Sequence, residues 1–271
     1  MKNYHDLVSY ILAHGRQRQD RTGVGTIGIF DAKLEFDLQD GYPLLTTKKV
    51  HFNSVIAELC MFLNGYNTLA YLHQYKCTIW DEWADENGNL GRIYGVQWRR
   101  WRSGDTSEID QLAAVVKDLK ENPFNRRHLV SAWNVGELHQ MALPPCHYAF
   151  QFYVRQDGFA NQLDMKVHMR SVDVFLGLPF NIASYAALLQ YVALICHYDV
   201  GRLIMDLGDT HIYLNHINQC QELLRRNPDK YPLPRLEILP PYTLEIGGVH
   251  PHQFVLVGYE SYPAIKAPIA V

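Results

Sequence analysis

The hydrophobic positions along the chain recur at helical spacing in four segments. Two of them come early, at about residues 4–14 and 54–63, and in each case a glycine soon follows the last apolar residue, as at the end of many helices. A third segment runs from about residue 107 until the Asn122-Pro123 pair ends it. The fourth, at about residues 182–196, is apolar nearly all round, so we expect it to be the central helix.

Other segments are rich in the β-branched and aromatic residues of strands. These are residues 26–38, residues 128–134 and two runs on either side of Gln156-Asp157-Gly158, which is typical of a hairpin turn. Because the strands pair through hairpins and not through regular crossover helices, the pattern predicts an α+β fold. The chain contains no internal repeat and no long linker, so we expect a single domain over residues 1–271.

Charge and cysteine content exclude several classes of protein. With 25 basic and 28 acidic residues the net charge is −3, so no global attraction draws the chain to nucleic acid or an anionic membrane. Five cysteines without metal-type spacing argue against a disulfide framework or a zinc site and favour a reducing compartment. Since the sequence has neither a signal peptide nor a run of about 18 apolar residues, we expect a cytoplasmic protein.

The predicted hairpin has a chemical consequence at its open end. Cys146 lies about as far before the turn as Arg170 lies after it, so antiparallel pairing brings the two residues together. A guanidinium beside a thiol stabilises the thiolate, so we expect a lowered pKa and a nucleophile at neutral pH. The alternative is that Cys146 is one more small buried hydrophobic residue, but the neighbouring Pro144-Pro145 and His147 favour a functional role.

Several longer blocks point to one family. In order they read DRTG from Asp20, TIWDEWADENGNLG from Thr78, RRHLVSAWNVGEL from Arg126, MALPPCHYAFQFYV from Met141, RSVDVFLGLPFNIASYA from Arg170, GDTHIYLNH from Gly208 and the terminal IKAPIAV. Several such blocks in order are far more specific than one short motif. By them the chain resembles the folate-dependent thymidylate synthases over nearly its whole length. The resemblance implies a mixed β-sheet layered with helices and a homodimer formed through the sheets.

The resemblance also implies a reaction. It is the reductive methylation of dUMP to dTMP with 5,10-methylenetetrahydrofolate as co-substrate, which leaves as dihydrofolate, and it needs no metal. Cys146 would add covalently to C6 of the uracil ring. The residues that match the family's catalytic group are Cys146, Glu58, Tyr94, Arg170, Asp173, Asn181 and His147. On sequence alone, Glu58 fits either a solvated helix face or a buried functional carboxyl.

The nucleotide site implied by the resemblance draws on both subunits. Its residues are Arg21, Arg126, Arg127, Arg170, Ser171, Asp173, Asn181 and, at the deoxyribose, His211 and Tyr213. Arg126 and Arg127 would reach the phosphate of the second subunit, although such a pair also fits a solvated turn. Asn181 would read the O4 and N3–H edge of uracil, and its alternative role is to cap the helix that begins at Ile182.

The folate site implied by the resemblance is mostly apolar. Its residues are Ile79, Trp80, Trp83, Leu143, Asp173, Leu176, Gly177, Phe180 and the terminal Ala270-Val271. Apolar walls suit a flat pterin, and Asp173 can accept hydrogen bonds from its guanidine-like edge. Lys48 and Lys49 would face the glutamate tail, or else form an ordinary solvated pair. The terminal residues would close over the folate and exclude water.

The chain departs from the family pattern in three places, one of which is a hairpin that is a few residues longer than usual. His168 and Met169 stand where a Tyr-Gln pair usually precedes the arginine, and the segment 247–253 is unfamiliar. These departures leave a second function open, that of a dUMP hydroxymethylase, which adds water in place of hydride and gives 5-hydroxymethyl-dUMP. Trp80 and the C-terminal tail, both intact, favour the synthase.

Two weaker hypotheses come from short motifs. Residues 97–102 mix basic and aromatic side chains, the composition of a platform for single-stranded RNA, which would suit an inactive relative of the family. In an acidic protein one such cluster is weak evidence, so we expect no specific nucleic acid. His250 and His252 could bind a metal ion but lack further ligands at a suitable spacing.

Overall fold

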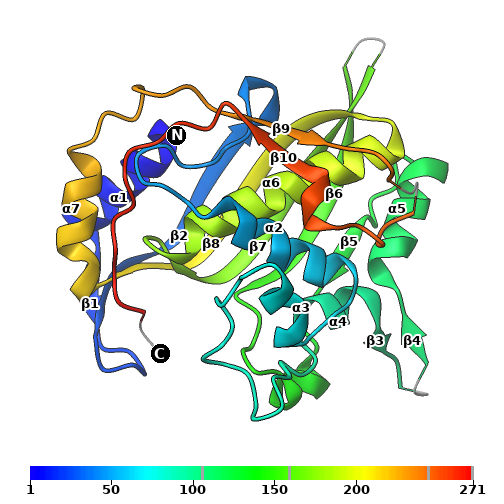
Figure 1. Cartoon of the computed structure of the whole chain (residues 1–271), viewed down its shortest axis with the longest axis horizontal. Helices are drawn as coiled ribbons and strands as arrows, with labels where there is room; N and C mark the ends of the chain where they lie inside the picture. The colour runs from blue at the N-terminus through cyan, green and yellow to red at the C-terminus, as the bar shows by residue number, and fades with distance from the viewer. Residues whose placement is uncertain (105–106, 158–159, 243–244, 270–271) are drawn as a thin grey trace.

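A computed structural model describes residues 1–104, 107–157, 160–242 and 245–269 (Figure 1). The helices in these residues are α1 (Lys2–His14), α2 (Phe52–Leu63), α3 (Leu69–Gln74), α4 (Tyr94–Arg99), α5 (Gln111–Glu121), α6 (Gly177–Cys196) and α7 (Ile217–Leu224). The strands are β1 (Arg16–Arg18), β2 (Thr26–Asp37), β3 (Trp101–Arg102), β4 (Glu108–Ile109), β5 (Leu129–Ser131), β6 (His147–Asp157), β7 (Ala160–Asp173), β8 (Asp199–Tyr213), β9 (Arg235–Ile238) and β10 (Phe254–Val257). Short 3-10 helices are η1 (Leu38–Asp40), η2 (Val135–Gln140), η3 (Leu214–His216) and η4 (Pro251–Gln253).

Six strands form one mixed sheet in the order β1-β2-β8-β7-β6-β5. Neighbouring strands pair antiparallel except β7 and β8, which run parallel and are connected through α6. Two smaller pairs, β9 with β10 and β3 with β4, lie outside this sheet. The α+β fold with a mixed sheet is therefore confirmed.

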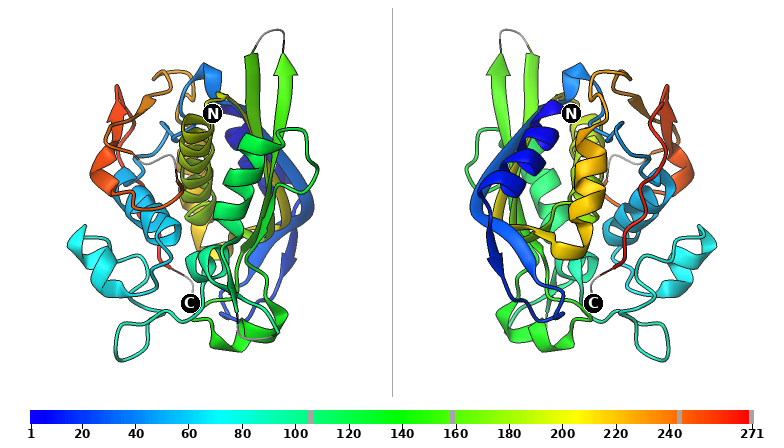
Figure 2. Two further views of the ribbon diagram at one scale, coloured as in Figure 1. Left: turned by 90° about the vertical axis from the view of Figure 1, so that its right-hand side faces the viewer. Right: turned by 90° about the vertical axis from the view of Figure 1, so that its left-hand side faces the viewer.

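Helices cover one face of the large sheet (Figure 2). α1 packs on β2, α6 on β7 and β8, and α5 on β5, while α2 lies against the far side of α6. Alternate side chains of the strands point toward these helices, as do Leu203, Met205 and Leu207 of β8, and they join a large buried cluster. The described helices leave the other face uncovered, and there Phe30 and Tyr153 are 83% and 63% exposed.

The first two helices end where the sequence predicted. α1 stops at His14, before Gly15, and α2 stops at Leu63. Gly65 has a φ of 68°, a conformation that a residue with a Cβ rarely adopts. This turn lets the Tyr66 N–H donate to the Met61 carbonyl at 2.9 Å, which satisfies a carbonyl at the helix end.

The predicted start of the third helix was wrong. α5 begins at Gln111, because the Asp110 side chain accepts a hydrogen bond from the Ala113 N–H at 2.9 Å and so caps the helix. Ile109 belongs to β4 instead and is 46% exposed. The predicted end was correct, since the helix stops before Asn122-Pro123.

The predicted start of the fourth helix was also wrong. α6 begins at Gly177 and takes in Pro179, which fits there because a backbone N–H in the first turn has no helical partner. Asn181 therefore lies inside the helix, and the hypothesis that it caps the helix is wrong. By length and composition α6 could cross a membrane, so the sequence does contain one long apolar run that the prediction missed. Of the 18 most apolar consecutive residues of this helix, 78% are buried inside the protein. The central position predicted for this helix is confirmed.

The long hairpin has the predicted strands. β6 pairs antiparallel with β7 from His147↔Met169 to Asp157↔Ala160, and the predicted turn extends to residue 158, outside the described residues. The segment predicted at 128–134 forms only the short strand β5. The register of the hairpin brings the start of β6 beside the C-terminal part of β7, where the candidate site begins.

The unusual residues of the sequence occupy three different surroundings. His168 lies on the uncovered face of the sheet, where its Nδ1 is 2.8 Å from Asp206 Oδ2. Met169 is buried in the core. The segment 247–253 packs on the end of α2, where the Asn64 side chain accepts from the Gly248 N–H and donates to the Val249 carbonyl.

Candidate active site

Glu58 is the only charged residue of α2, and the structure places its carboxyl against aromatic side chains. The indole Nε1 of Trp80 donates a hydrogen bond to Glu58 Oε1 at 2.6 Å. Burial raises the pKa of Glu58 from its ordinary value of 4.5 to about 7, although the Trp80 hydrogen bond acts in the opposite direction. Glu58 can therefore either donate or accept a proton near neutral pH, as general acid–base catalysis requires.

The Tyr94 side chain connects α4 to Cys146, which directly precedes β6. α4 can approach α2 closely because Gly95 has no side chain; a Cβ there would lie 2.5 Å from the Phe62 Cα. The Tyr94 hydroxyl accepts a hydrogen bond from the Cys146 N–H at 2.8 Å. The Tyr94 ring also lies 6.2 Å from the ring of Trp80, which donates to Glu58, so Tyr94 links Cys146 to Glu58 in one site.

Cys146 lies directly before β6 and is the partly exposed member of the five cysteines, since the other four are buried. The Arg170 N–H donates to the Cys146 carbonyl at 2.8 Å. The Arg170 guanidinium also donates to the carbonyls of Pro145 at 2.8 Å and Pro144 at 2.9 Å. The prediction that the hairpin brings Cys146 and Arg170 together is confirmed.

The predicted direction of the Cys146 pKa is not what the structure gives. Burial raises the pKa of the thiol, and the charges of Arg170 and Arg21 and the hydrogen bond with Tyr94 offset this only in part. The expectation of a lowered pKa was wrong because removal of the thiolate from water destabilises it more than the two arginines and the hydrogen bond stabilise it. Cys146 is therefore mainly a protonated thiol in the free protein.

His147 is paired with Tyr185, a residue that the sequence did not single out. His147 Nδ1 lies 2.6 Å from the Tyr185 hydroxyl, and its ring stacks on Tyr94 with centroids 4.0 Å apart. Burial lowers the pKa of His147 to about 3, so the imidazole is neutral at physiological pH. A phenol inside an apolar helix needs a polar partner, and that need was the available signal for Tyr185.

Asp173 shapes the turn between β7 and α6. Its Oδ1 accepts hydrogen bonds from the N–H groups of Phe175 at 3.0 Å and Leu176 at 3.1 Å, directly before the helix begins at Gly177. Asn181 follows one turn later and is partly exposed. A carboxylate and an amide thus lie near the N-terminal end of α6, where they can meet a polar ring edge.

Two of the five predicted phosphate residues have an electrostatic effect on Cys146. Arg21 is exposed in a loop that Asp20 orders by accepting from the N–H groups of Thr22 and Gly25. Arg21 and Arg170 both lower the pKa of Cys146, whereas Ser171 follows in β7 and is partly exposed. The remaining two candidates are the exposed residues Arg126 and Arg127, which form no side-chain hydrogen bond or ion pair with the described part of the chain.

The two predicted sugar-binding residues lie together at the end of β8. The rings of His211 and Tyr213 are 5.2 Å apart, edge to face. In the parallel pairing of β7 with β8, His211 lies opposite Asp173, so the two sugar-binding candidates lie beside that carboxylate.

The chain returns to this region near its C-terminus. His216 Nε2, in η3 directly after β8, lies 2.7 Å from the Pro268 carbonyl oxygen. The predicted lid residues Ala270 and Val271 lie outside the described residues. The end of the described chain is therefore docked three residues beyond Tyr213.

The predicted folate residues form a partly open apolar surface. Trp80 is buried, and the other apolar candidates pack on the core with part of their surface free; these are Ile79, Trp83, Leu143, Leu176 and Phe180. Lys48 does not form a solvated pair with the exposed Lys49: its Nζ donates to the Phe175 carbonyl and lies 3.7 Å from the centre of the Phe175 ring. Burial lowers the pKa of Lys48 to about 8.

The two weaker hypotheses gain no support from the structure. In the segment 97–102, Trp98 is buried and the Arg99 guanidinium is paired with Asp110 at 2.7 Å, so neither offers a free surface to a base. The rings of His250 and His252 are stacked 5.5 Å apart. Across the described ranges no group of three or more His, Cys, Asp or Glu residues could hold a metal ion.

Comparison with known families gives a match over nearly the whole chain. The family described as thymidylate synthase matches residues 2–271. The matched range begins within α1 and contains α2 with Glu58, the hairpin with Cys146 and Arg170, and the start of α6. All of the candidate site thus lies inside it.

Proposed function

The chain belongs to the thymidylate synthase family, methyltransferases of nucleotide biosynthesis, and from this premise we propose that it converts dUMP to dTMP with 5,10-methylenetetrahydrofolate as co-substrate. One observation carries the proposal: a partly exposed thiol lies between an arginine and a tyrosine, and that tyrosine packs on the tryptophan that donates to a carboxyl group of pKa about 7. A nucleophile and a proton carrier at one site suit covalent activation of a uracil ring.

In the first step, Cys146 Sγ adds to C6 of uracil and the double bond moves to the O4 side of the ring. The thiol passes its proton to water in the site as the C–S bond forms, and Glu58, acting through water, delivers a proton to O4. The raised pKa of Glu58 supports this role, because a carboxyl group that is already ionised has no proton to give. The product of this step carries nucleophilic character at C5.

In the next step, C5 attacks the methylene carbon of the co-substrate as the bond from that carbon to N10 breaks, and O4 returns its proton to Glu58 through water. Water held at the Tyr94 hydroxyl then accepts the C5 proton, and cleavage of the bond from the methylene carbon to N5 releases tetrahydrofolate and leaves an exocyclic methylene on the ring. Hydride from tetrahydrofolate reduces this methylene to methyl, Cys146 leaves C6, and dTMP and dihydrofolate are released. His147, neutral and held by Tyr185, orients Tyr94 by stacking on it.

Charged side chains and hydrogen-bonding side chains would together hold the nucleotide. Arg21, Arg170 and Ser171 would bind the phosphate from one subunit, and Arg126 and Arg127 from the other, because a guanidinium is a permanent bidentate donor to phosphate oxygens. Asn181 would pair with O4 and N3–H of uracil. His211 and Tyr213 would hold the 3′-hydroxyl.

The folate co-substrate would stack over the nucleotide. The partly open apolar residues around Trp80 fit a flat ring, and Asp173 has a second carboxylate oxygen for its polar edge. The tail that docks at His216 would close the site to water.

A second copy of the chain would cover the open face of the sheet. The uncovered face of the sheet carries the exposed apolar residues Phe30 and Tyr153, which a second copy would bury in a homodimer formed through the sheets. Five unpaired cysteines suit a reducing compartment, so we place the enzyme in the cytoplasm.

The product distinguishes the synthase from the hydroxymethylase. We expect dTMP together with dihydrofolate, because Trp80 and the tail should exclude water until hydride is transferred. Mass spectrometry identifies the nucleotide product. The rise in near-ultraviolet absorbance measures the dihydrofolate formed in the same reaction. Tritium release from C5 serves only as a control for turnover, since both reactions release that proton. A dominant product heavier than dTMP by one oxygen, without dihydrofolate, would make this protein a hydroxymethylase.

Mixing of two inactive variants tests the shared site. In a fully exchanged mixture of Cys146→Ala and Arg126→Ala chains, half of the dimers are mixed and each holds one undamaged site, so about a quarter of the wild-type activity should return. Subunit exchange is followed with two affinity tags, and each variant alone is the control. Absence of recovery after complete exchange would show that each site is built within one chain.

A further inference from the structure

A hydrogen-bonded cluster on α5 surrounds Asp118. Its Oδ1 accepts from the Asn122 side-chain amide at 2.9 Å, and its Oδ2 accepts from the Asn125 amide at 2.6 Å. The buried His128 ring lies close to this carboxylate, with Nε2 3.1 Å from the same Oδ2, although the angle is not that of a hydrogen bond. These contacts hold the pKa of the Asp118 carboxyl below its usual range, so the carboxylate is ionised at neutral pH.

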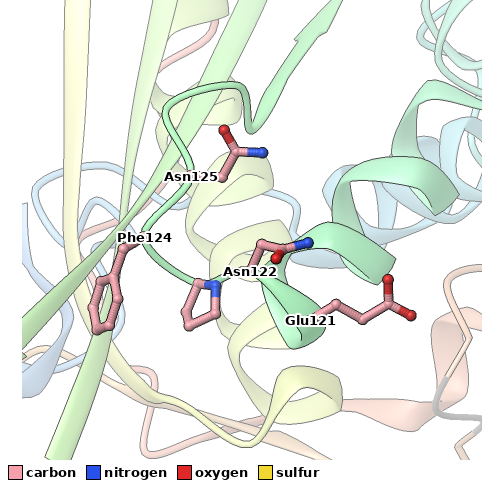
Figure 3. A pocket seen from close by; sticks show the side chains of 5 residues that line it. Glu121, Asn122, Phe124 and Asn125 are labelled. Atoms are coloured by element: carbon pink, nitrogen blue, oxygen red, sulfur yellow. The ribbon is translucent and has the colours of Figure 1, made fainter.

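The residues that Asp118 contacts lie on both sides of Arg126-Arg127. Figure 3 shows the turn that leaves α5, where Asn122 and Asn125 are among the residues that line a surface hollow. Asn125 immediately precedes Arg126, and His128 immediately follows Arg127. The His128 carbonyl also accepts from the Phe152 N–H at 2.8 Å, which fixes it to β6. The backbone of the Arg126-Arg127 pair is thus held in place by contacts of the residues directly before and after it.

The arginine side chains themselves remain available. Both are exposed, and neither forms a side-chain hydrogen bond or ion pair with the residues that the structure describes. Asp118 already accepts hydrogen bonds from two amides, so its carboxylate orders the backbone without capturing a guanidinium. A backbone fixed before binding loses less conformational entropy when its side chains bind an anion.

We propose that Asp118 is a positioning residue that holds the Arg126-Arg127 segment ready for the phosphate of a nucleotide in the second subunit. The inference rests on the proposed function and adds to it a residue that contacts no substrate. It acts through Asn125 and His128, which lie on the two sides of the arginine pair.

The first test is steady-state kinetics of Asp118→Ala. We expect its KM for dUMP to rise about tenfold, with kcat and the KM for methylenetetrahydrofolate within about twofold of wild type, because loss of binding shared by the ground and transition states raises KM alone. Glu121→Ala is the matched control: Glu121 lies on the same helix, lines the hollow in Figure 3 and, in the described part of the chain, forms an ion pair only with the exposed Lys117, at 3.9 Å. Its KM should not change.

Mixed dimers separate positioning across the interface from general damage to the fold. In one, Cys146→Ala pairs with Asp118→Ala, so the working Cys146 is served by an intact Asp118 segment, and we expect the wild-type KM. In the other, a chain with both substitutions pairs with a wild-type chain, and we expect the raised KM. Each dimer contains one Asp118→Ala chain, so a purely structural defect would affect both equally.

The outcomes are distinct. Equal KM values in the two mixed dimers would overturn the positioning role, whereas failure of the wild-type protein to turn over dUMP would overturn the proposed function itself. If Asp118→Ala does not fold, Asn125→Ala tests the same role, because it removes the amide that donates to the Asp118 carboxylate. An unchanged KM in a folded Asn125→Ala dimer would likewise overturn the inference.

Discussion

Replacement of Cys146 by alanine is expected to lower the turnover of dUMP by at least about a thousandfold, because the covalent route to a nucleophilic C5 disappears with the thiol. The backbone contacts of this residue do not involve Sγ: its N–H donates to Tyr94 and its carbonyl accepts from Arg170. The variant should therefore fold and still bind dUMP. Single-turnover kinetics measure the loss, and calorimetric titration measures the retained binding.

A second cysteine provides the control for this loss. Cys196→Ala removes a thiol that is buried in α6, and we expect its turnover of dUMP to stay near that of wild type. If Cys146→Ala were to turn over dUMP at a near-normal rate, Cys146 could not be the nucleophile, and the proposed mechanism would fail at its first step.

Replacement of Glu58 by glutamine is expected to lower kcat about a hundredfold or more, within the range that general acid–base catalysis contributes. Glutamine keeps an oxygen that can accept from Trp80 Nε1, so the aromatic surroundings should stay in place. The wild-type kcat should change with an apparent pKa near 7, the value for Glu58 in the folded protein, and this inflection should be missing in the variant. A Glu58→Gln enzyme with the same pH profile would assign the proton transfer to another group.

The same substitution has an opposite effect on stability. The folded protein holds the Glu58 proton up to about pH 7, while the unfolded chain releases it near 4.5, so the folded state binds more protons in between. The free energy of unfolding of the wild type therefore falls as pH rises from 4.5 to 7, by up to about 3 kcal/mol, and stays lower above pH 7. The Glu58→Gln variant does not lose this stability, because a glutamine side chain does not ionise. Urea titrations at pH 4.5 and pH 8 should thus show a stability difference that shifts in favour of Glu58→Gln at the higher pH, together with the loss of activity.

The sequence by itself determined those features that depend on local periodicity and on register. Apolar residues at helical spacing placed α1 and α2, and the all-apolar segment identified α6 as the central helix. The distance of Cys146 and Arg170 from one turn was enough to bring them together, because antiparallel pairing is symmetrical about the turn. A lone carboxylate in the apolar α2 already indicated that Glu58 was unusual.

Only the tertiary structure decided what depends on burial and on contacts between distant segments. It showed that desolvation outweighs Arg170 at the Cys146 thiol, that Lys48 lies over Phe175, and that Tyr185 reaches His147. The physical reason is that a pKa follows from the sum of all nearby charges and from the water removed, and no stretch of sequence contains that sum. Helix starts were missed for a related reason, since the start of α6 is set by a turn that the Asp173 carboxylate orders after β7 ends.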